Sequence, residues 1–329
     1  MEAAGARGPR PGEAALGLCH NLPVLRGPLL VALLALLGLG GSAAHARNGW
    51  IAYEHVGDGA DRFQIYRMTA TGAHRRPLTA SHRYSSYDPA YAPRGERIVF
   101  VRAYKQSDLW TMKADGSHAR PLTRTKGIDE RAPAWSPDGK RIAFAVERPA
   151  ADHGIWVVGS NGQGRRRLTT GADTHPSWSP DGTEIAFQRN DPATEIDTIL
   201  VVPAAGGTPT TLSTDPGVSD LDPAWSPDGS RILFVSDRPD TIQLDLWTMS
   251  ATGTDVTRVT NTPNRDEYDP AWSPNGRRIV YSGSDAFHGA SSYQLYISEA
   301  NGAKTRKLTH ACGECAWIND DPSWQPLRG

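Results

Sequence analysis

The sequence predicts an all-β fold, a six-bladed β-propeller, from a repeated motif, from the turn chemistry of each repeat and from the complementarity of the two chain ends. In the motif, a proline is followed by a small residue and an aromatic one. It recurs at intervals of roughly 45 residues, the length of a four-stranded blade and longer than most helical solenoid repeats. The six motifs are Asp88-Pro89-Ala90-Tyr91, Ala132-Pro133-Ala134-Trp135, His175-Pro176-Ser177-Trp178, Asp222-Pro223-Ala224-Trp225, Asp269-Pro270-Ala271-Trp272 and Asp321-Pro322-Ser323-Trp324.

Residues 222–260 show how one repeat makes a blade. Pro223-Ala224-Trp225 is a short strand, and Ser226-Pro227-Asp228-Gly229 is a turn, because proline fixes φ and glycine accepts the left-handed conformation. An apolar run, an alternating run and a short outer segment follow. We therefore expect four strands in this order, and the other repeats follow the same pattern.

The two chain ends each supply part of a blade. Residues 50–53, 64–68 and 76–79 match the second, third and fourth strands of a repeat, whereas residues 321–325 match only a first strand. Each fragment alone leaves an unpaired strand edge. We therefore predict that the C-terminal strand pairs with the N-terminal strands, with Ser323-Trp324 beside Ile51-Ala52, and that this pairing closes a ring of six blades.

The aromatic residue of each motif has two interpretations. Large rings between adjacent blades would bury much apolar surface, whereas exposed rings would form a platform for sugars. Because the aromatic residue recurs once per repeat at the same place, packing between blades is the favoured interpretation.

The N-terminal region has the pattern of an export signal. An apolar run over residues 28–41 is preceded by arginines and followed by Ala44-His45-Ala46, so we predict a signal peptide over residues 1–46 and the propeller over residues 47–329. An uncleaved membrane anchor is the alternative, but residues 29–39 supply about half of the ~20 apolar residues that a spanning helix needs. We expect a periplasmic or secreted protein, with no transmembrane segment after cleavage.

Two cysteines remain after this cleavage, in Cys312-Gly313-Glu314-Cys315. In an oxidising compartment such a close pair favours a small disulfide that holds one loop. A redox pair, or half of a zinc site with His310, are the alternatives.

The composition excludes one class of partner. The formal net charge is −1, and Arg165-Arg166-Arg167 is the one short basic run. A nucleic-acid-binding face needs many clustered cations, so we expect no nucleic-acid partner. We expect the protein to be a monomer.

The repeat carries a family resemblance. Pro-Ala-Trp-Ser-Pro-Asp-Gly, then Arg-Ile and an apolar run, Leu-Trp-Thr-Met, Ala-x-Gly and Leu-Thr, resembles the TolB-like (WD40-like) β-propeller repeat over residues 49–326. The resemblance implies a propeller that docks a protein at one mouth of its channel, as TolB docks a peptidoglycan-associated lipoprotein. The α/β domain of TolB is not expected here. The sequence has no G-x-S-x-G motif, which argues against the serine peptidases that carry similar propellers.

The candidate site is the position before each motif proline. In a propeller the first strand lines the channel, so we expect these residues at one channel mouth. They are Asp88, Ala132, His175, Asp222, Asp269 and Asp321. More acidic residues stand close by in the sequence, namely Asp129, Glu130, Asp173, Asp220, Asp266, Glu267 and Asp320. We expect an acidic mouth with binding residues Asp88, His175, Asp222, Asp269 and Asp321.

These carboxylates have a structural and a functional interpretation. An aspartate before proline caps a turn by bonding to the backbone two residues on. A carboxylate-lined funnel instead attracts a basic partner segment or a hard cation such as Ca²⁺. No compact D-x-D-x-D-G loop is present, so the metal assignment stays open and no other cofactor is expected.

We predict a TolB-like binding module of the cell envelope that docks a protein or peptide at the acidic mouth. The alternative is a carbohydrate-binding or carbohydrate-active envelope propeller, a lyase or hydrolase, with an oligosaccharide as ligand. A scaffold that acts through its face loops is a third interpretation. We assign no catalytic residues.

Overall fold

The fold of the propeller region is all-β. The computed structural model describes residues 49–57, 60–238, 243–285, 292–310 and 318–326, which belong to one unit over residues 46–329. Within these ranges the chain forms strands and a single short 3₁₀ helix, η1 (Ala150–Asp152). No helix in the described part is long and apolar enough to cross a membrane.

Sixteen strands form four sheets of four strands each, and in every sheet the strands are adjacent in chain order. These strands are β4 (Ser85–Tyr91), β5 (Arg97–Ala103), β6 (Ser107–Lys113), β7 (Arg120–Pro121), β8 (Asp129–Trp135), β9 (Arg141–Arg148), β10 (Gly154–Gly159), β11 (Arg166–Arg167), β12 (Ala172–Trp178), β13 (Glu184–Asp191), β14 (Ile196–Pro203), β15 (Thr210–Thr211), β16 (Asp220–Trp225), β17 (Arg231–Ser236), β18 (Asp245–Ser250) and β19 (Thr257–Arg258).

The other eight strands form one larger sheet. They are β1 (Trp50–Val56), β2 (Gln64–Thr69), β3 (Arg76–Pro77), β20 (Arg265–Trp272), β21 (Arg278–Asp285), β22 (Tyr293–Glu299), β23 (Arg306–Lys307) and β24 (Ile318–Trp324). The strands β20 to β23 follow one another, and β24 precedes β1, β2 and β3. One residue pair, Tyr293 with Ile318, joins the two halves.

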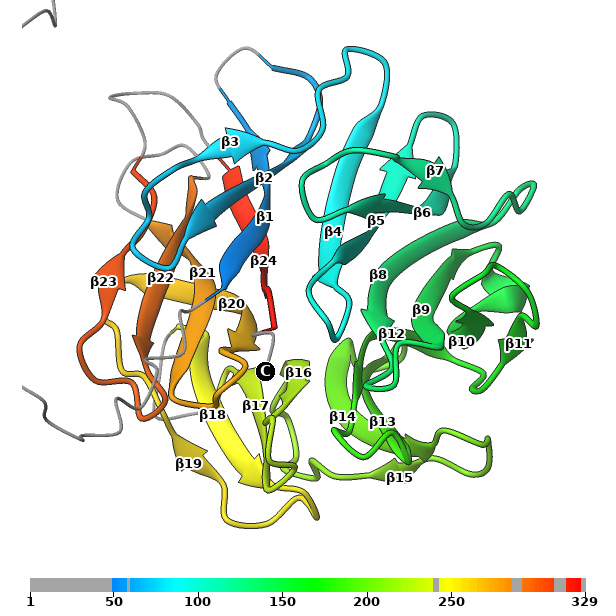
Figure 1. The fold of residues 1–329 in the computed structure, drawn as a ribbon. Helices are drawn as coiled ribbons and strands as arrows, with labels where there is room; N and C mark the ends of the chain where they lie inside the picture. Colours follow the sequence, from blue (N-terminus) through cyan, green and yellow to red (C-terminus); the bar gives the residue numbers. More distant parts are fainter. Residues whose placement is uncertain (1–48, 58–59, 239–242, 286–291, 311–317, 327–329) are drawn as a thin grey trace, which may run out of the picture. The chain divides into compact units, whose positions relative to one another are not determined.

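The predicted pairing of the chain ends is present. β1 and β24 lie side by side and run antiparallel, with Ile51 opposite Trp324 and Ala52 opposite Ser323 (Figure 1). The Gln325 N–H donates to the Trp50 carbonyl at 2.7 Å and extends the pairing by one step. The edge of β1 that does not pair with β2 is therefore covered by the C-terminal strand.

The turn after each first strand follows the sequence prediction. In the type repeat, the Asp228 Oδ1 atom accepts hydrogen bonds from the Ser226 hydroxyl at 2.7 Å and from the Ser230 N–H at 3.0 Å. Gly229 has φ +74°, a conformation that glycine adopts without strain. The same bonds to a turn carboxylate recur at Asp138 and Asp181.

The core lies between consecutive sheets. The second strand of each sheet supplies fully buried apolar side chains, as in Ile232 to Val235 of β17. Phe144 and Ile142 of β9 pack with Val99 of β5 from the preceding sheet. First strands also contact one another in sequence: β4 with β8, β8 with β12, β12 with β16, β16 with β20, β20 with β24 and β24 with β4.

The motif aromatics take part in this packing. Tyr91, Trp178, Trp225 and Trp324 are buried, and Trp135 and Trp272 are half-buried. Three of the indoles donate from Nε1 to a carbonyl of the preceding sheet: Trp135 to Ala90 at 3.2 Å, Trp178 to Ala134 at 3.1 Å and Trp272 to Ala224 at 3.1 Å. The rings therefore fill the space between sheets, as expected for packing residues.

Buried acids connect neighbouring sheets at the same seams. The fully buried Glu130 accepts a hydrogen bond from the Thr123 hydroxyl, which itself accepts from the Leu109 N–H at 2.9 Å. Thr260 bonds in the same way to Glu267, and Thr169 to Asp173. The expectation that Glu130, Asp173 and Glu267 contribute to an acidic mouth is therefore wrong, because these carboxylates are enclosed in the seams.

Two expectations concern residues outside the described ranges. The signal peptide over residues 1–46 and the pair Cys312 and Cys315 both remain predictions.

Candidate functional site

The residue before each motif proline lies inside the first strand of its sheet, not ahead of it. For example, β4 begins at Ser85, upstream of Asp88. The pairing with the second strand shifts register at this point, between Tyr87 and Ala90, so Asp88 and Pro89 form a β-bulge. The same register shift occurs in the other first strands facing their second strands. The sequence-based prediction therefore began each first strand too late in the chain.

All six residues of this position have a left-handed backbone. The φ angles are +49° for Asp88, +45° for Ala132, +49° for His175, +50° for Asp222, +48° for Asp269 and +46° for Asp321. This conformation costs about 1–2 kcal/mol for a residue with a Cβ atom, and a following proline disfavours helical backbone values further. The packed sheets on either side must hold this conformation, because it recurs in every first strand.

The left-handed bulges bring the six positions together around one space. Asp88, Ala132, His175, Asp222, Asp269 and Asp321, with the proline and small residue that follow each of them, line a cavity of about 290 Å³. We call this space the central cavity. All five predicted binding residues line it, and Ala132 supplies the sixth position without a polar group.

Two aspartates of the central cavity, Asp88 and Asp222, bond to the next sheet along the chain. The Ala132 N–H donates to Asp88 Oδ2 at 2.8 Å, and the Asp269 N–H donates to Asp222 Oδ2 at 3.3 Å. The expected bond of each aspartate to its own turn, two residues on, is wrong for these two residues. The bulge turns the carboxylate away from its own backbone and towards the neighbouring first strand.

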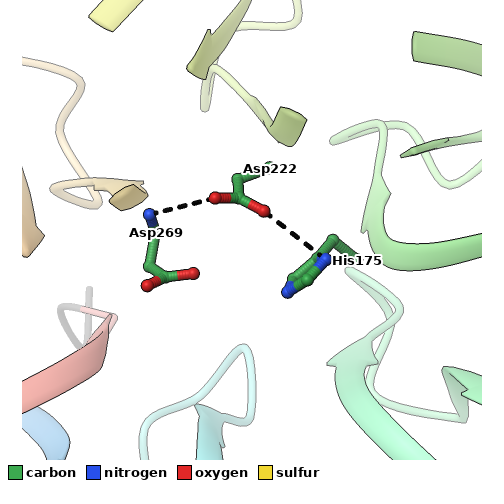
Figure 2. A group of neighbouring side chains, drawn as sticks. All are labelled: His175, Asp222 and Asp269. Atoms are coloured by element: carbon green, nitrogen blue, oxygen red, sulfur yellow. Dashed lines mark hydrogen bonds and ion pairs between the residues drawn. The ribbon is translucent and has the colours of Figure 1, made fainter. Parts of the chain in front are cut away.

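His175 belongs to the same network. Its Nδ1 atom lies 3.4 Å from Asp222 Oδ1, so Asp222 lies between His175 and the backbone of Asp269 (Figure 2). The three side chains come from β12, β16 and β20, the first strands of consecutive sheets.

Two further acidic residues complete the site. Glu54 of β1, which the sequence analysis missed, is buried and lies directly opposite Asp320 of β24. One oxygen of Asp320, Oδ1, is buried and has no hydrogen-bond partner among the described residues. The predicted pairing of the chain ends was the signal that would have placed Glu54 here, since its register next to β24 follows from Ile51 and Ala52.

Burial and crowding of like charges disturb these carboxyl groups. Burial, then the carboxylates of Asp321 and Asp320, raise the pKa of Asp269 well above its usual range. Burial, then Glu54 and Asp88, raise the pKa of Asp321 well above its usual range. Burial, then Asp88 and Asp320, do the same for the pKa of Glu54. The cavity thus gathers acidic groups in a place where their ionised forms are poorly solvated.

The ionisable groups form two sets that are close enough to share a cation. One set is His175, Asp222 and Asp269, and the other is Glu54, Asp88 and Asp321. In each set, one possible ligand atom per residue lies within 4.8 Å of the others.

Comparisons with known proteins place this fold. Residues 192–327 match the sequence profile of the TolB beta propeller domain family. Among curated protein sequences, none matches this chain at a significant level. TolB from Acinetobacter baumannii is similar in structure, with a TM-score of 0.71 and 23% identity over 85% of this chain and 67% of that protein.

Two other solved structures are similar at lower identity. Putative TolB from Agrobacterium tumefaciens has a TM-score of 0.65 and 18% identity over 85% of this chain and 99% of that one. An oligogalacturonate lyase from Vibrio parahaemolyticus has a TM-score of 0.54 and 13% identity over 78% of each chain. At these identities the likeness establishes the fold, and function has to be argued from the site.

Proposed function

We propose that this chain, whose residues 192–327 match the TolB beta propeller domain family and whose fold is similar to that of TolB, is a binding module of the cell envelope whose central cavity docks a protein or peptide segment. The observation that carries the proposal is the convergence of Asp88, Asp222, Asp269 and Asp321 with His175 on one cavity. A concave site with one sign of charge concentrates its electric field. It therefore favours a segment that presents a lysine or arginine.

The proposed architecture is a ring of six blades closed by β24. In this arrangement the eight-stranded sheet counts as two blades, one from β20 to β23 and one from β24 with β1, β2 and β3. The single residue pair between β22 and β24 and the contact of β24 with β4 support it. Closure would leave no exposed inner strand edge.

The proposed location is the periplasm or the outside of the cell, after removal of residues 1–46, and the proposed assembly is a monomer. The support is the apolar run and the Ala44-His45-Ala46 site of the N-terminal segment. Mass spectrometry of the protein from its native host tests this, since cleavage after Ala46 leaves Arg47 as the first residue.

The set Glu54, Asp88 and Asp321 is proposed to hold a hard cation such as Ca²⁺. All donor atoms of this set are carboxylate oxygens, the ligands that Ca²⁺ prefers. Calorimetric titration with CaCl₂ before and after Asp88→Asn tests it, and equal heats from the two proteins would refute it.

Carbohydrate binding has less support from the site. The described residues that line the central cavity include no phenylalanine, tyrosine or tryptophan, and the motif aromatics are engaged in packing between sheets. We therefore keep protein or peptide docking as the proposed function.

Docking is tested by capture of envelope proteins followed by titration. The wild type and an Asp88→Asn/Asp222→Asn variant are immobilised, and each captured protein is purified and titrated against both. We expect the variant to bind at least tenfold more weakly, and salt to weaken wild-type binding, because the contact is charged.

The matched control is Asp138→Asn/Asp181→Asn, which removes the same charge from exposed turns. Asparagine fits these turns, since Asn275 occupies the equivalent place in another repeat and accepts the Arg277 N–H at 3.1 Å. If the cavity variant and the turn variant bind a captured protein as tightly as the wild type, the central cavity is not the docking site.

A further inference from the structure

The two cation-sized sets in the central cavity differ in donor chemistry. Glu54, Asp88 and Asp321 offer oxygen only, whereas the other set adds the imidazole nitrogen of His175 to two carboxylates. Imidazole is a ligand for zinc, copper, iron and nickel, and it contributes little to binding of calcium or magnesium. The two sets are therefore suited to different ions.

The three groups of the second set face a common space. Figure 2 shows the Asp222 carboxylate next to the imidazole of His175, with the Asp269 carboxylate directed into the space beside them. His175, Asp222 and Asp269 sit at equivalent bulges of β12, β16 and β20, and the packed sheets fix their backbones. The three ligands are therefore pre-organised before a metal binds, which lowers the entropic cost of binding.

A second observation indicates that positive charge is missing here. The Oδ1 atom of Asp320 is buried without a hydrogen-bond partner among the described residues, and so is the Nδ1 atom of His175. A buried polar atom without a partner is costly, and a bound cation beside Asp269 would offset that cost.

We propose that His175, Asp222 and Asp269 bind a divalent transition metal of the zinc class, through one imidazole nitrogen and two carboxylate oxygens. Three protein ligands leave at least one coordination position open, as in zinc sites that keep a place for water or a ligand. His175, Asp222 and Asp269 all line the central cavity, so we expect the open position to be reached from it. The site goes beyond the docking function and does not depend on it.

The test is calorimetric titration of ZnCl₂ and CaCl₂ into the untagged protein over residues 47–329, after treatment with a chelator. For the wild type we expect one zinc ion bound per chain. His175→Ala should weaken zinc binding at least tenfold. His175→Asp should also weaken zinc binding without weakening calcium binding, because it replaces the nitrogen ligand by a carboxylate oxygen.

The matched control is His118→Ala, which removes an exposed histidine of the turn after β6. It should leave the zinc isotherm unchanged. Co²⁺ provides a second readout, since its visible absorption on binding should be lost in His175→Ala and retained in His118→Ala. Circular dichroism verifies that each variant is folded.

The proposal is overturned if the wild type binds no zinc, if His175→Ala binds zinc as tightly as the wild type, or if His118→Ala weakens it equally. These outcomes are independent of docking, because the titration contains no partner protein. Failure to observe docking in the capture experiment would not count against the metal site. Failure to bind zinc would likewise not count against docking.

Discussion

At the scale of single residues, the same local conformation serves packing and site formation. Each residue before a motif proline adopts a left-handed backbone, although only glycine does so without strain. Ala132 shows that the bulge does not depend on a polar side chain, because its φ of +45° matches that of Asp88. The packing of the strands therefore determines the bulge. The side chain at that position determines which functional group lines the central cavity.

A buried carboxyl group gives the residue-scale prediction. Glu267 is fully buried, and burial raises its pKa to about 7, against hydrogen bonds from Thr260 and Thr262 that lower it. Its folded-state pKa lies above its unfolded value, so the stability that it contributes is present below about pH 4.5. That stability is lost as the pH rises through about 7.

We expect Glu267→Gln to unfold at a higher temperature than the wild type at pH 8 and to gain little at pH 5. The gain at pH 8 should be about 1–2 kcal/mol, because a neutral amide avoids the burial of charge. Thermal denaturation from pH 4.5 to 8.5 with EDTA present measures it. Glu130→Gln is the comparison, with a smaller gain expected because Arg165 lies 3.6 Å from the Glu130 carboxylate. A constant difference across the pH range would contradict the assignment.

The site residues could be predicted from the repeat, and their geometry could not. Because the repeat equates Asp88 with His175, Asp222, Asp269 and Asp321, one inference places all five on the same part of the fold. The sequence does not reveal the left-handed bulge, since aspartate before proline is equally compatible with an ordinary turn. Glu54 belongs to a second strand and has no counterpart in the motif, so only the register between β1 and β24 places it.

At the scale of elements, the turns between the third and outer strands determine how sheets contact one another. In five of the six repeats the glycine of this turn lies against a carbonyl at the outer strand of the neighbouring blade, and Gly206 is the exception. Thus a Cβ atom on Gly302 would lie 2.0 Å from the Val259 carbonyl, and one on Gly253 would lie 2.5 Å from that of Leu212. These glycines are needed for φ and for the close approach.

This arrangement predicts different costs for two glycine substitutions. Gly302→Ala meets the backbone of the neighbouring sheet and has φ +82°, whereas Gly139→Ala has φ +71° with no atom closer than 3.8 Å. We expect Gly139→Ala to cost about 1 kcal/mol of unfolding free energy, the cost of the left-handed backbone alone. Gly302→Ala should cost clearly more, since the sheets must move apart. Urea denaturation measures both values, and equal values would show that the seam tolerates the extra atom.

Strand order could be predicted because apolar runs, turn residues and short outer segments recur in every repeat. The first strands began earlier than predicted because their upstream halves, such as Ser85 to Tyr87, carry polar residues that do not alternate clearly. Inward acids of these segments accept bonds from hydroxyl groups across the seam, like the bond from Thr123 to Glu130. Such pairs join residues of different sheets, and a pattern within one strand does not reveal them.

At the scale of the whole propeller unit, pairing of the chain ends links the first sheet to the last. Trp324 is 5% exposed and packs with Ile51, Met68 and Val280, which come from β1, β2 and β21. Its side chain therefore joins both halves of the eight-stranded sheet. The sequence predicted this contact because each end lacked the strands that the other supplied, an argument of complementarity that needs no structural detail.

Removal of this side chain tests how far the unit depends on the joined ends. We expect Trp324→Ala to cost about 3–5 kcal/mol, the range for truncation of a buried tryptophan. Trp272→Ala, at the equivalent place of β20 but half-buried, should cost less. Chemical denaturation followed by intrinsic fluorescence and by circular dichroism measures both variants.

The cooperativity of unfolding carries the decisive result. If the ends close the ring, Trp324→Ala should lower the midpoint of one transition seen by both probes, because loss of the joint exposes the edge of β1 and weakens every seam in turn. An unchanged midpoint would mean that β24 contributes nothing to stability. A separate early transition confined to the β1 to β3 strands would mean that this part unfolds independently, which a closed ring does not allow.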